Sequence, residues 1–202
     1  VEPLCVSALN TPAARASGQV FLRVLRDTLF ERGGSNLLLP RTDLGSLFPE
    51  AAAQWLAEHG GRVEAGQRVR ELAREAGAWL VDGRDFGAVL LACPPQEAAR
   101  LAEGTGVAAP AWAALARAMQ HEAIATVYVT GGPSLPLPML ALRSGPQAPA
   151  QFVFDRGQSH GQPGLLAFVA SAAADLSADW MDQAEAQLQR IAQPGPVRWH
   201  KC

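Results

Sequence analysis

The sequence predicts a mixed α/β fold of the α+β class, in which helices and short strands follow one another without an internal repeat. Some segments have apolar residues at helical spacing and end at paired glycines, as at Gly33-Gly34 and Gly60-Gly61. Others are short, rich in β-branched residues and bounded by glycine or proline, which is typical of strands. The 202 residues are sufficient for one core, or for a core with a smaller lobe.

The helical pattern occurs in five stretches. The first two cover residues 13–32 and 43–58, and Asp43 is a candidate N-cap because its carboxylate can accept hydrogen bonds from first-turn amides. The second stretch is expected to bury Leu47, Phe48, Trp55 and Leu56. The other helices are expected over residues 96–102, 110–120 and 178–192.

The strand pattern is clearest around Asp82-Gly83, a hairpin-turn signal that follows the run 79–81. Residues 88–92 form a continuous apolar run, Ala-Val-Leu-Leu-Ala, which predicts a strand buried on both faces. Weaker extended patterns lie at residues 62–64 and 69–74. Further strands are expected over residues 124–130, 139–142, 151–154, 165–171 and 197–201.

Composition limits the class of partner and the compartment. The net charge is −2, and the basic residues, all arginine except Lys201, are spread along the chain, so no nucleic-acid partner is expected. No apolar run reaches the roughly 18 to 20 residues that cross a bilayer, and residues 1–10 lack the basic start of a signal peptide. The cysteines are odd in number and widely spaced (Cys5, Cys93 and Cys202), which favours a reducing cytoplasm over a disulfide framework.

Three common kinds of site are not supported by the motifs. Residues 104–109 have the spacing of a dinucleotide-binding loop, but a helical stretch precedes them and Pro110 follows, so we interpret them as a linker. The four histidines are scattered, so no metal site is expected. No Gly-x-Ser-x-Gly motif supports serine hydrolase chemistry.

A longer pattern is more specific because its parts occur in a fixed order. Gly60-Gly61-Arg62-Val63 ends a helix and is followed by Val69-Arg70-Glu71-Leu72, then by the turn 82–84, and then by residues 88–94, Ala-Val-Leu-Leu-Ala-Cys-Pro. This order resembles the middle of the flavin amine oxidase superfamily. The same elements are equally compatible with an ordinary helix–hairpin–strand unit that binds no ligand.

The flanking segments favour one branch of that superfamily. Residues 2–12, residues 16–25 and the run 154–157 (Phe-Asp-Arg-Gly) are similar to the squalene-associated FAD-dependent desaturases, or hydroxysqualene dehydroxylases, which are relatives of the phytoene desaturases. The resemblance implies an internal fragment of an oxidoreductase that converts hydroxysqualene to squalene in hopanoid synthesis. Two alternatives stay open, a fragment of a carotenoid desaturase or amine oxidase, and a non-enzymatic module that binds a lipid or a partner protein.

The resemblance implies FAD as the cofactor and a partial FAD-binding domain over residues 43–103. Val69 matches the position whose backbone meets the adenine, and Ala92, Cys93 and Pro94 match the strand end beside the cofactor. Gly87 stands where the family usually has an aspartate. The family's glycine-rich strand-turn-helix, which holds the pyrophosphate, does not occur in these 202 residues, nor does its glycine-containing segment that sits over the flavin. We therefore expect that this chain does not retain FAD tightly and has no turnover alone.

The resemblance also implies a substrate-binding lobe, made of residues 104–202 with a helical part in residues 1–42. It is expected to contain a mixed β-sheet covered by helices and to shelter an isoprenoid in an apolar cavity, because such a substrate offers almost no hydrogen-bonding group. Candidate lining residues, each also compatible with a core position, are Leu38, Leu39, Val127, Met139, Leu140, Leu142 and Phe152. No catalytic residue is identified, and Asp155 and Arg156 are candidates only through the Phe-Asp-Arg-Gly run.

Assembly and location follow from the same features. If the strand at 88–92 has no neighbouring strand, its unpaired edge favours a homo-oligomer. The expected location is cytoplasmic. The apolar substrate that the resemblance implies favours peripheral association of the protein with the inner face of the membrane.

Overall fold

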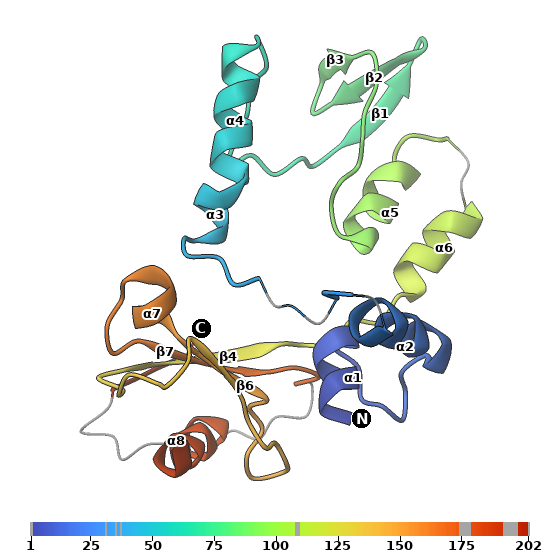
Figure 1. Ribbon diagram of the computed structural model, residues 1–202. Coiled ribbons are helices and arrows are strands. Elements are labelled where there is room, and N and C mark those ends of the chain that lie inside the picture. Colours follow the sequence, from blue (N-terminus) through green and yellow to red (C-terminus); the bar gives the residue numbers. More distant parts are fainter. Residues whose placement is uncertain are drawn as a thin grey trace. The chain divides into compact units, whose positions relative to one another are not determined.

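The computed structural model describes residues 2–30, 32–34, 36, 38–107, 110–173, 179–191 and 198–201. These form two compact units, whose elements are labelled in Figure 1. Unit 1 comprises Val1–Trp55 and Glu122–Cys202, and unit 2 comprises Leu56–His121. This division differs from the sequence-based boundaries at residues 42 and 103. Residues 104–121 belong to unit 2 because their helix packs on the preceding helix of that unit.

Unit 1 contains a five-stranded sheet. Its strands, in the spatial order β5-β6-β7-β4-β8, are β4 (Ala125–Thr130), β5 (Met139–Ala141), β6 (Phe152–Asp155), β7 (Leu166–Ala170) and β8 (Arg198–Lys201). All described pairings are antiparallel, which corrects the expected mixed sheet. The connections 142–151 and 156–165 are too short for the crossover that parallel neighbours require.

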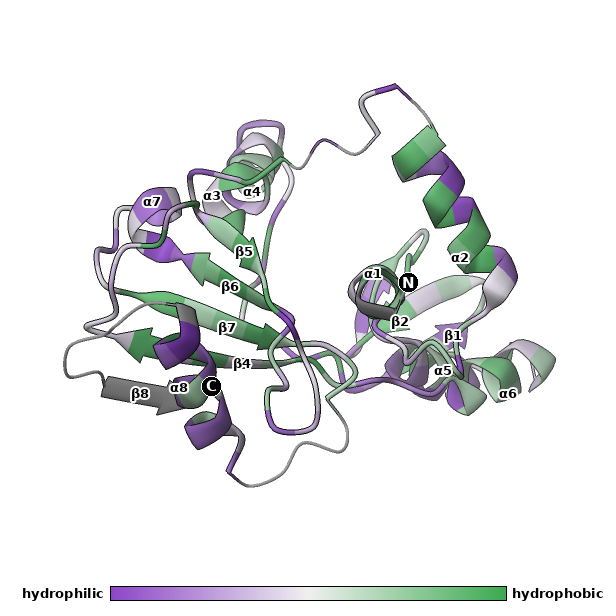
Figure 2. Ribbon diagram, turned by 60° about the horizontal axis from the view of Figure 1, so that its bottom comes forward, coloured by the Kyte–Doolittle hydropathy of each residue, from purple (hydrophilic) through white to green (hydrophobic). Residues whose placement is uncertain are grey.

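The core of unit 1 lies between one face of this sheet and helix α8 (Trp180–Ile191). Strands β5, β6 and β7 are coloured mostly as hydrophobic in Figure 2, whereas α8 is hydrophilic over much of its length, as expected for a helix with one buried stripe. Buried Gln187 fixes α8 to the sheet, because its side chain accepts a hydrogen bond from Ala150 N at 3.0 Å and donates one to Ala150 O at 3.0 Å. The buried residues are Val127, Val129, Leu135, Ala150, Val153, Leu166, Phe168, Ala170, Trp180, Ala184 and Leu188.

A short helix, α7 (Arg156–His160), follows β6 and was not expected from the sequence. Asp155 caps its N-terminus by accepting hydrogen bonds from Gly157 N and Gln158 N. Gly161 ends it at φ 66°, a conformation that glycine adopts without steric cost.

The N-terminal part of unit 1 is helical and more broken than its pattern predicts. It contains α1 (Glu2–Leu9), α2 (Gly18–Leu25), the π-helix η1 (Arg26–Phe30) and α3 (Leu44–Leu47), and α4 (Pro49–Glu58) follows. The predicted helix 13–32 begins only after Ser17, whose hydroxyl accepts a hydrogen bond from Val20 N. The predicted helix 43–58 is capped by Asp43 as expected and is interrupted at Phe48, because the residue before a proline disfavours the helical conformation.

Asn10 ties the end of α1 to the rest of unit 1. Its side-chain amide donates a hydrogen bond to Glu122 O at 2.9 Å and accepts one from Ala172 N at 2.7 Å. The side chains that were expected to be buried on the second helix are exposed instead, namely Leu47, Phe48, Trp55 and Leu56. Helical spacing creates an apolar stripe, but burial needs a neighbouring surface to cover it.

Unit 2 combines a small sheet with two helices. Strands β1 (Leu72–Glu75), β2 (Ala78–Val81) and β3 (Arg84–Phe86) form an antiparallel sheet in that order. The predicted turn at Asp82-Gly83 is confirmed, and both of its residues have positive φ, as a two-residue hairpin loop of type I′ requires. Helices α5 (Pro95–Glu103) and α6 (Pro110–Ala118) pack together through Ala99, Ala113 and Ala116.

Residues 88–92 are not a strand, which corrects the expectation of a strand buried on both faces. The segment is extended, and the backbone groups of residues 87–93 have no hydrogen-bond partner among the described residues. Val89 and Leu91 are half-buried, whereas Leu90 is 90% exposed. The segment has strand-like alternation but lacks a neighbouring strand to pair with.

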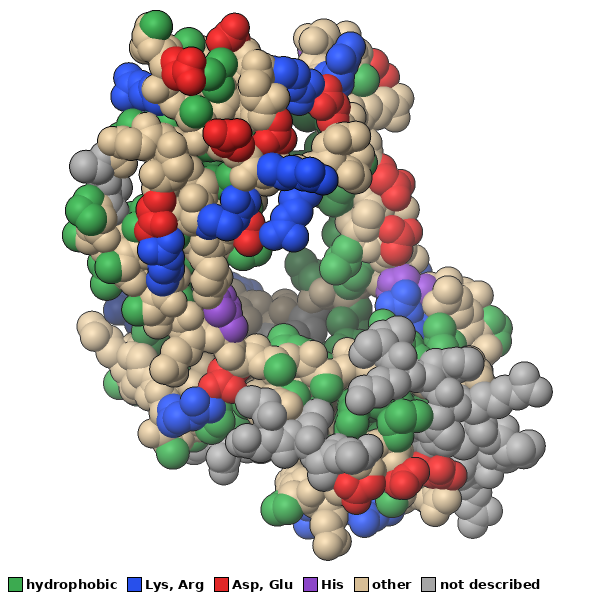
Figure 3. Space-filling view, turned by 180° about the vertical axis from the view of Figure 1, so that it is seen from behind, with side chains coloured by type: hydrophobic (Ala, Val, Ile, Leu, Met, Phe, Trp, Pro, Cys, Tyr) green, Lys and Arg blue, Asp and Glu red, His purple; other side chains and the backbone are tan. Residues whose placement is uncertain are grey.

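Other sequence-based expectations concern the surface. Among the described residues, no helix is long and apolar enough to cross a bilayer. Cys5 and Cys93 are free thiols, and Cys202 lies outside the described residues. Acidic and basic side chains intermix on the face shown in Figure 3.

Candidate functional site

A pocket of about 560 Å³ lies within unit 2. Its walls come from the segment before β1, from β1 and β2, from the extended segment after β3, and from the first turns of α5. Most of these side chains are apolar, and Arg68 and Glu97 are the charged ones among them. The lining residues are Arg68, Val69, Leu72, Val81, Val89, Leu90, Leu91, Ala92, Cys93, Glu97 and Leu101.

The predicted cofactor-binding residues lie close together in this pocket. Val69, Ala92 and Cys93 all line it, although Val69 is more than twenty positions away from the other two in the sequence. Pro94 is next to the pocket as the N-cap residue of α5. Their role in binding stays a prediction, but the fold brings the two segments together as that role requires.

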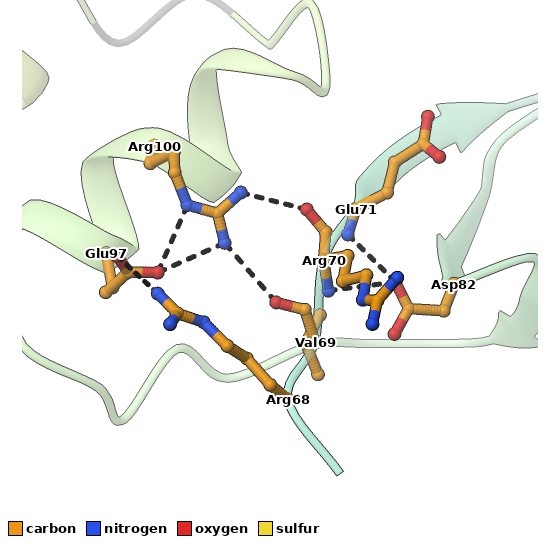
Figure 4. A network of polar contacts seen from close by, with 7 residues as sticks. All are labelled: Arg68, Val69, Arg70, Glu71, Asp82, Glu97 and Arg100. Atoms are coloured by element: carbon orange, nitrogen blue, oxygen red, sulfur yellow. Dashed lines mark hydrogen bonds and ion pairs between the residues drawn. The ribbon is translucent and has the colours of Figure 1, made fainter.

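Helix α5 holds the backbone beside Val69 through Arg100 (Figure 4). The guanidinium donates one hydrogen bond to Arg70 O at 2.9 Å and another to Val69 O at 3.3 Å. The same side chain donates from Nε to Glu97 at 3.1 Å. A planar guanidinium with several donors can make these contacts at once, whereas a single ammonium group cannot reproduce them.

The turn between β2 and β3 holds the same backbone from another element. The Asp82 carboxylate accepts hydrogen bonds from Arg70 N at 3.0 Å and from Glu71 N at 2.8 Å, as Figure 4 shows. These two backbone amides lower the pKa of Asp82 below its ordinary value, because they stabilise the charged form. The backbone N–H of Asp82 donates in turn to Glu71 O at 3.1 Å.

Glu97 connects the two arginines at the pocket. It accepts hydrogen bonds from Arg100 and from Arg68, each at 3.1 Å, and these contacts lower the pKa of Glu97 below its ordinary value. The carboxylate therefore stays ionised at neutral pH and orients both guanidiniums. The sequence shows Glu97 and Arg100 at helical i,i+3 spacing, but their contact with residues 69 and 70 depends on tertiary structure.

The lining residues fit one part of FAD and not another. Apolar side chains suit a flat heterocycle such as adenine, and the space is large enough to hold one. The pyrophosphate needs backbone donors at a helix N-terminus. Here α5 begins at Pro94-Pro95, whose nitrogens carry no hydrogen, and its first turn holds the negative Glu97. The lining residues therefore suit the base and offer no cradle for the phosphates.

The predicted substrate-binding residues fall on opposite faces of the sheet in unit 1. Because paired residues share a face, the register puts Leu140, Val153, Phe168 and Val127 in one row. Val127 is 0% exposed in the core with α8, so it lies in packed core and faces no described pocket. Leu140 packs against the same core.

The opposite face of this sheet carries the other predicted residues. Met139 pairs with Phe154, and Phe152 pairs with Ala141 and Val169, so Met139, Phe152 and Phe154 share the face turned away from α8. All three side chains are half-buried. Leu38 is 94% exposed and Leu39 is 37% exposed. Leu142 lines a separate open cavity of about 610 Å³ in unit 1. The structure therefore brings together Met139 and Phe152 but not the whole set.

Asp155 and Arg156, the candidates from the Phe-Asp-Arg-Gly run, occupy different settings. Asp155 is 2% exposed and accepts hydrogen bonds from Leu135 N at 2.9 Å and from the Gln158 amide at 2.8 Å, besides capping α7. Burial alone would raise the pKa of Asp155, but these hydrogen bonds outweigh it and lower the pKa. Its contacts make Asp155 a structural anchor. The Nε of Arg156 is buried without a hydrogen-bond partner in the described part of the chain.

Comparisons with known proteins support the fold and go no further. No protein-family model matches this chain, and no curated protein matches it. A crystal structure of a "putative protoporphyrinogen oxidase" from Exiguobacterium sp. 255-15 is similar with a TM-score of 0.59 and 18% sequence identity. The likeness covers 99% of this chain and 50% of that protein, so this chain spans about half the length of its structural neighbour. The predicted α+β class is confirmed.

Proposed function

We propose that this chain is part of an FAD-dependent oxidoreductase of the squalene-associated desaturase type. In this proposal unit 2 binds the adenine end of FAD, and unit 1 shelters a long isoprenoid such as hydroxysqualene. The observation that carries the proposal is the apolar pocket where Val69, Ala92 and Cys93 meet. The fold likeness to a protein described as an oxidase is a second, weaker support.

The chemistry of the pocket suits a purine base. Its aliphatic walls can cover both faces of a flat ring and remove them from water, which is favourable in proportion to the apolar area buried. The backbone N–H of Val69 has no hydrogen-bond partner among the described residues and can donate to a ring nitrogen. The base would thus be held by shape and by the backbone.

The rest of the cofactor would be held elsewhere. The lining residues offer no cradle for the pyrophosphate, so this chain is expected to bind FAD no more tightly than it binds AMP. When bound in a complete site, the reduced flavin supplies the hydride chemistry that removes the substrate's hydroxyl. The task of unit 1 is then to orient an apolar chain and to exclude water.

The sheet of unit 1 offers a surface for that task. Met139, Phe152 and Phe154 present neighbouring apolar side chains on the face turned away from α8. An isoprenoid would be recognised there by apolar contact, with few polar groups to fix its position. A carotenoid would suit the same surface, so the identity of the isoprenoid is part of what the test decides.

The test of the cofactor half is a titration of the full chain, labelled with ¹⁵N, with AMP. We expect amide shifts at Val69 and at residues 89–93, and none with ribose 5-phosphate, which carries the sugar and phosphate without the base. Equal shifts with both probes, or none with AMP, would refute adenine binding in unit 2. The non-enzymatic binding module would then be the better interpretation.

The test of the substrate half uses the three methionines as reporters. With methyl-¹³C methionine, squalene delivered in detergent micelles is expected to shift Met139. The methyl signals of two control residues should be the same as in empty micelles. These are Met181 of α8, which packs against the core of unit 1, and exposed Met119 of unit 2. An unchanged Met139 signal would refute this face as the isoprenoid surface. β-Carotene in the same micelles tests the carotenoid alternative.

A further inference from the structure

Almost all the polar backbone groups of residues 69–71 are hydrogen-bonded to other parts of unit 2. It has six polar groups, an N–H and a C=O from each residue, and five of them have partners. The Arg100 guanidinium donates hydrogen bonds to Val69 O and Arg70 O. The Asp82 carboxylate accepts hydrogen bonds from Arg70 N and Glu71 N. The Asp82 N–H donates one to Glu71 O. The sixth group, the Val69 N–H, has no partner in the part of the chain that the structure describes.

We propose that Arg100 and Asp82 are positioning residues that hold residues 69–71 so that the Val69 N–H stays in place for a ligand acceptor atom. This inference rests on the proposed function, because it assigns how the adenine site of unit 2 is built. The two residues act through the backbone and need not touch the ligand. Such preorganisation raises affinity by reducing the ordering that binding would otherwise require.

The geometry favours positioning over a general structural role. Arg100 comes from α5 and Asp82 from the β2–β3 turn, so a helix and a hairpin hold one short segment from two elements (Figure 4). The segment they hold lines the pocket at Val69. Glu97, which also lines the pocket, orients Arg100 and adds Arg68 to the same network. The contacts therefore meet on the short backbone segment whose first residue, Val69, lines the pocket.

The first variant pair separates positioning from folding. Arg100→Gln removes the contacts with both carbonyls, and Arg117→Gln is its control, because Arg117 forms an ion pair with Glu103 and contacts neither residue 69 nor residue 70. AMP is the probe, and its affinity is measured by ¹⁵N shifts on the full chain. We expect Arg100→Gln to weaken AMP binding about tenfold, since one residue's backbone must then be ordered on binding. Arg117→Gln is expected to bind as the wild type does.

A second pair tests the contact from the hairpin without adding strain. Asp82 has φ 46°, a conformation that both glycine and asparagine tolerate. Asp82→Gly removes the acceptor, whereas Asp82→Asn keeps a side-chain oxygen for the two amides. We expect AMP binding to fall several-fold in the first and to be largely kept in the second. The urea midpoint of each variant is measured alongside, so that weaker AMP binding by an Asp82→Gly chain that is still fully folded is assigned to positioning and not to loss of stability.

The outcomes distinguish this inference from the function on which it rests. If the wild type does not bind AMP, the proposed function fails and the inference fails with it. If the wild type binds AMP and Arg100→Gln and Asp82→Gly bind it equally well, only the inference is overturned. If Arg100→Gln does not fold, the comparison of Asp82→Gly with Asp82→Asn decides the question by itself.

Discussion

Two apolar segments of similar composition differ in this protein in strand pairing and in burial. Strand β7 has the sequence Leu-Ala-Phe-Val-Ala, and residues 88–92 have the sequence Ala-Val-Leu-Leu-Ala. Strand β7 is paired on both sides, by β6 and β4, and α8 covers its Leu166 and Phe168. Residues 88–92 pair with no strand among the described residues, and Leu90 is 90% exposed.

The comparison teaches that burial is a property of a segment's neighbours. Both runs are short, apolar and of strand length, so the sequence assigns them the same structure. Hydrogen bonding to adjacent strands and cover from a helix are what convert such a run into a buried strand. Unit 1 supplies both to β7, and unit 2 supplies a cover only for Val89 and Leu91 of the other run.

The largest expected effect compares the two segments directly. Phe168→Ala is expected to lower the free energy of unfolding by about 3–5 kcal/mol, because it leaves a cavity beneath α8. Leu90→Ala, at an exposed position, should change it by no more than about 0.5 kcal/mol. Urea unfolding of both variants gives the values. Similar losses in the two variants would mean that Leu90 is covered in solution.

The next effect concerns how α8 is held against the sheet. Gln187→Ala removes the hydrogen bonds to Ala150 N and Ala150 O and leaves these backbone groups buried without partners. We expect a loss of about 1–3 kcal/mol in the free energy of unfolding. Exposed Gln147, in the loop before Ala150, serves as the control through Gln147→Ala. A loss no larger than that of the control would contradict the anchoring role.

A pH-dependent effect tests the buried carboxylate of unit 1. The pKa of Asp155 lies below its ordinary value of 3.8, so its carboxylate contributes stability that is complete above that value and lost as the pH falls through the folded-state pKa. We expect the urea midpoint to show no change from this linkage down to about pH 5, to fall as the pH drops through 3.8 and below, and to fall less in Asp155→Asn. An equal pH dependence in both proteins would show that other groups cause it.

The smallest expected effect concerns self-association through residues 88–92. An unpaired extended backbone favours pairing with another chain, and a lysine at an exposed position opposes it. Leu90→Lys should therefore reduce any concentration-dependent association seen by sedimentation. Leu115→Lys, at an exposed apolar position on α6, should not reduce it to the same extent, because a helix offers no unpaired edge. The reverse order would assign the association to apolar contact alone.

Local chemistry made much of the fold predictable. The Asp82-Gly83 turn, the Asp43 cap, the helices α5, α6 and α8 and the strands of unit 1 occur where turn residues and periodicity placed them. Most of the predictions that were wrong concern features that depend on which other segments of the chain lie beside the residue. The side chains of Phe48 and Trp55 are exposed. The expected mixed sheet was wrong in part because the connections between β5, β6 and β7 are too short for parallel neighbours.

The candidate site was predictable in part for a similar reason. The resemblance selected Val69, Ala92 and Cys93, and these line one pocket. It could not select Arg100 or the role of Asp82, because their contacts join residues 11 to 31 positions apart through folded elements. For the isoprenoid surface, the strand positions were predictable, but the register alone separates Met139 and Phe152 from Val127.

The sequence by itself determined most of the helices and strands of this protein, because caps, turns and periodicity act over a few residues. It also determined the order of motifs on which the flavoenzyme proposal rests. Only the tertiary structure decided which apolar runs are buried, which face of the sheet each side chain occupies, and that residues 69–71 are held by Arg100 and Asp82. These properties arise from contacts between distant segments, and no local pattern encodes them.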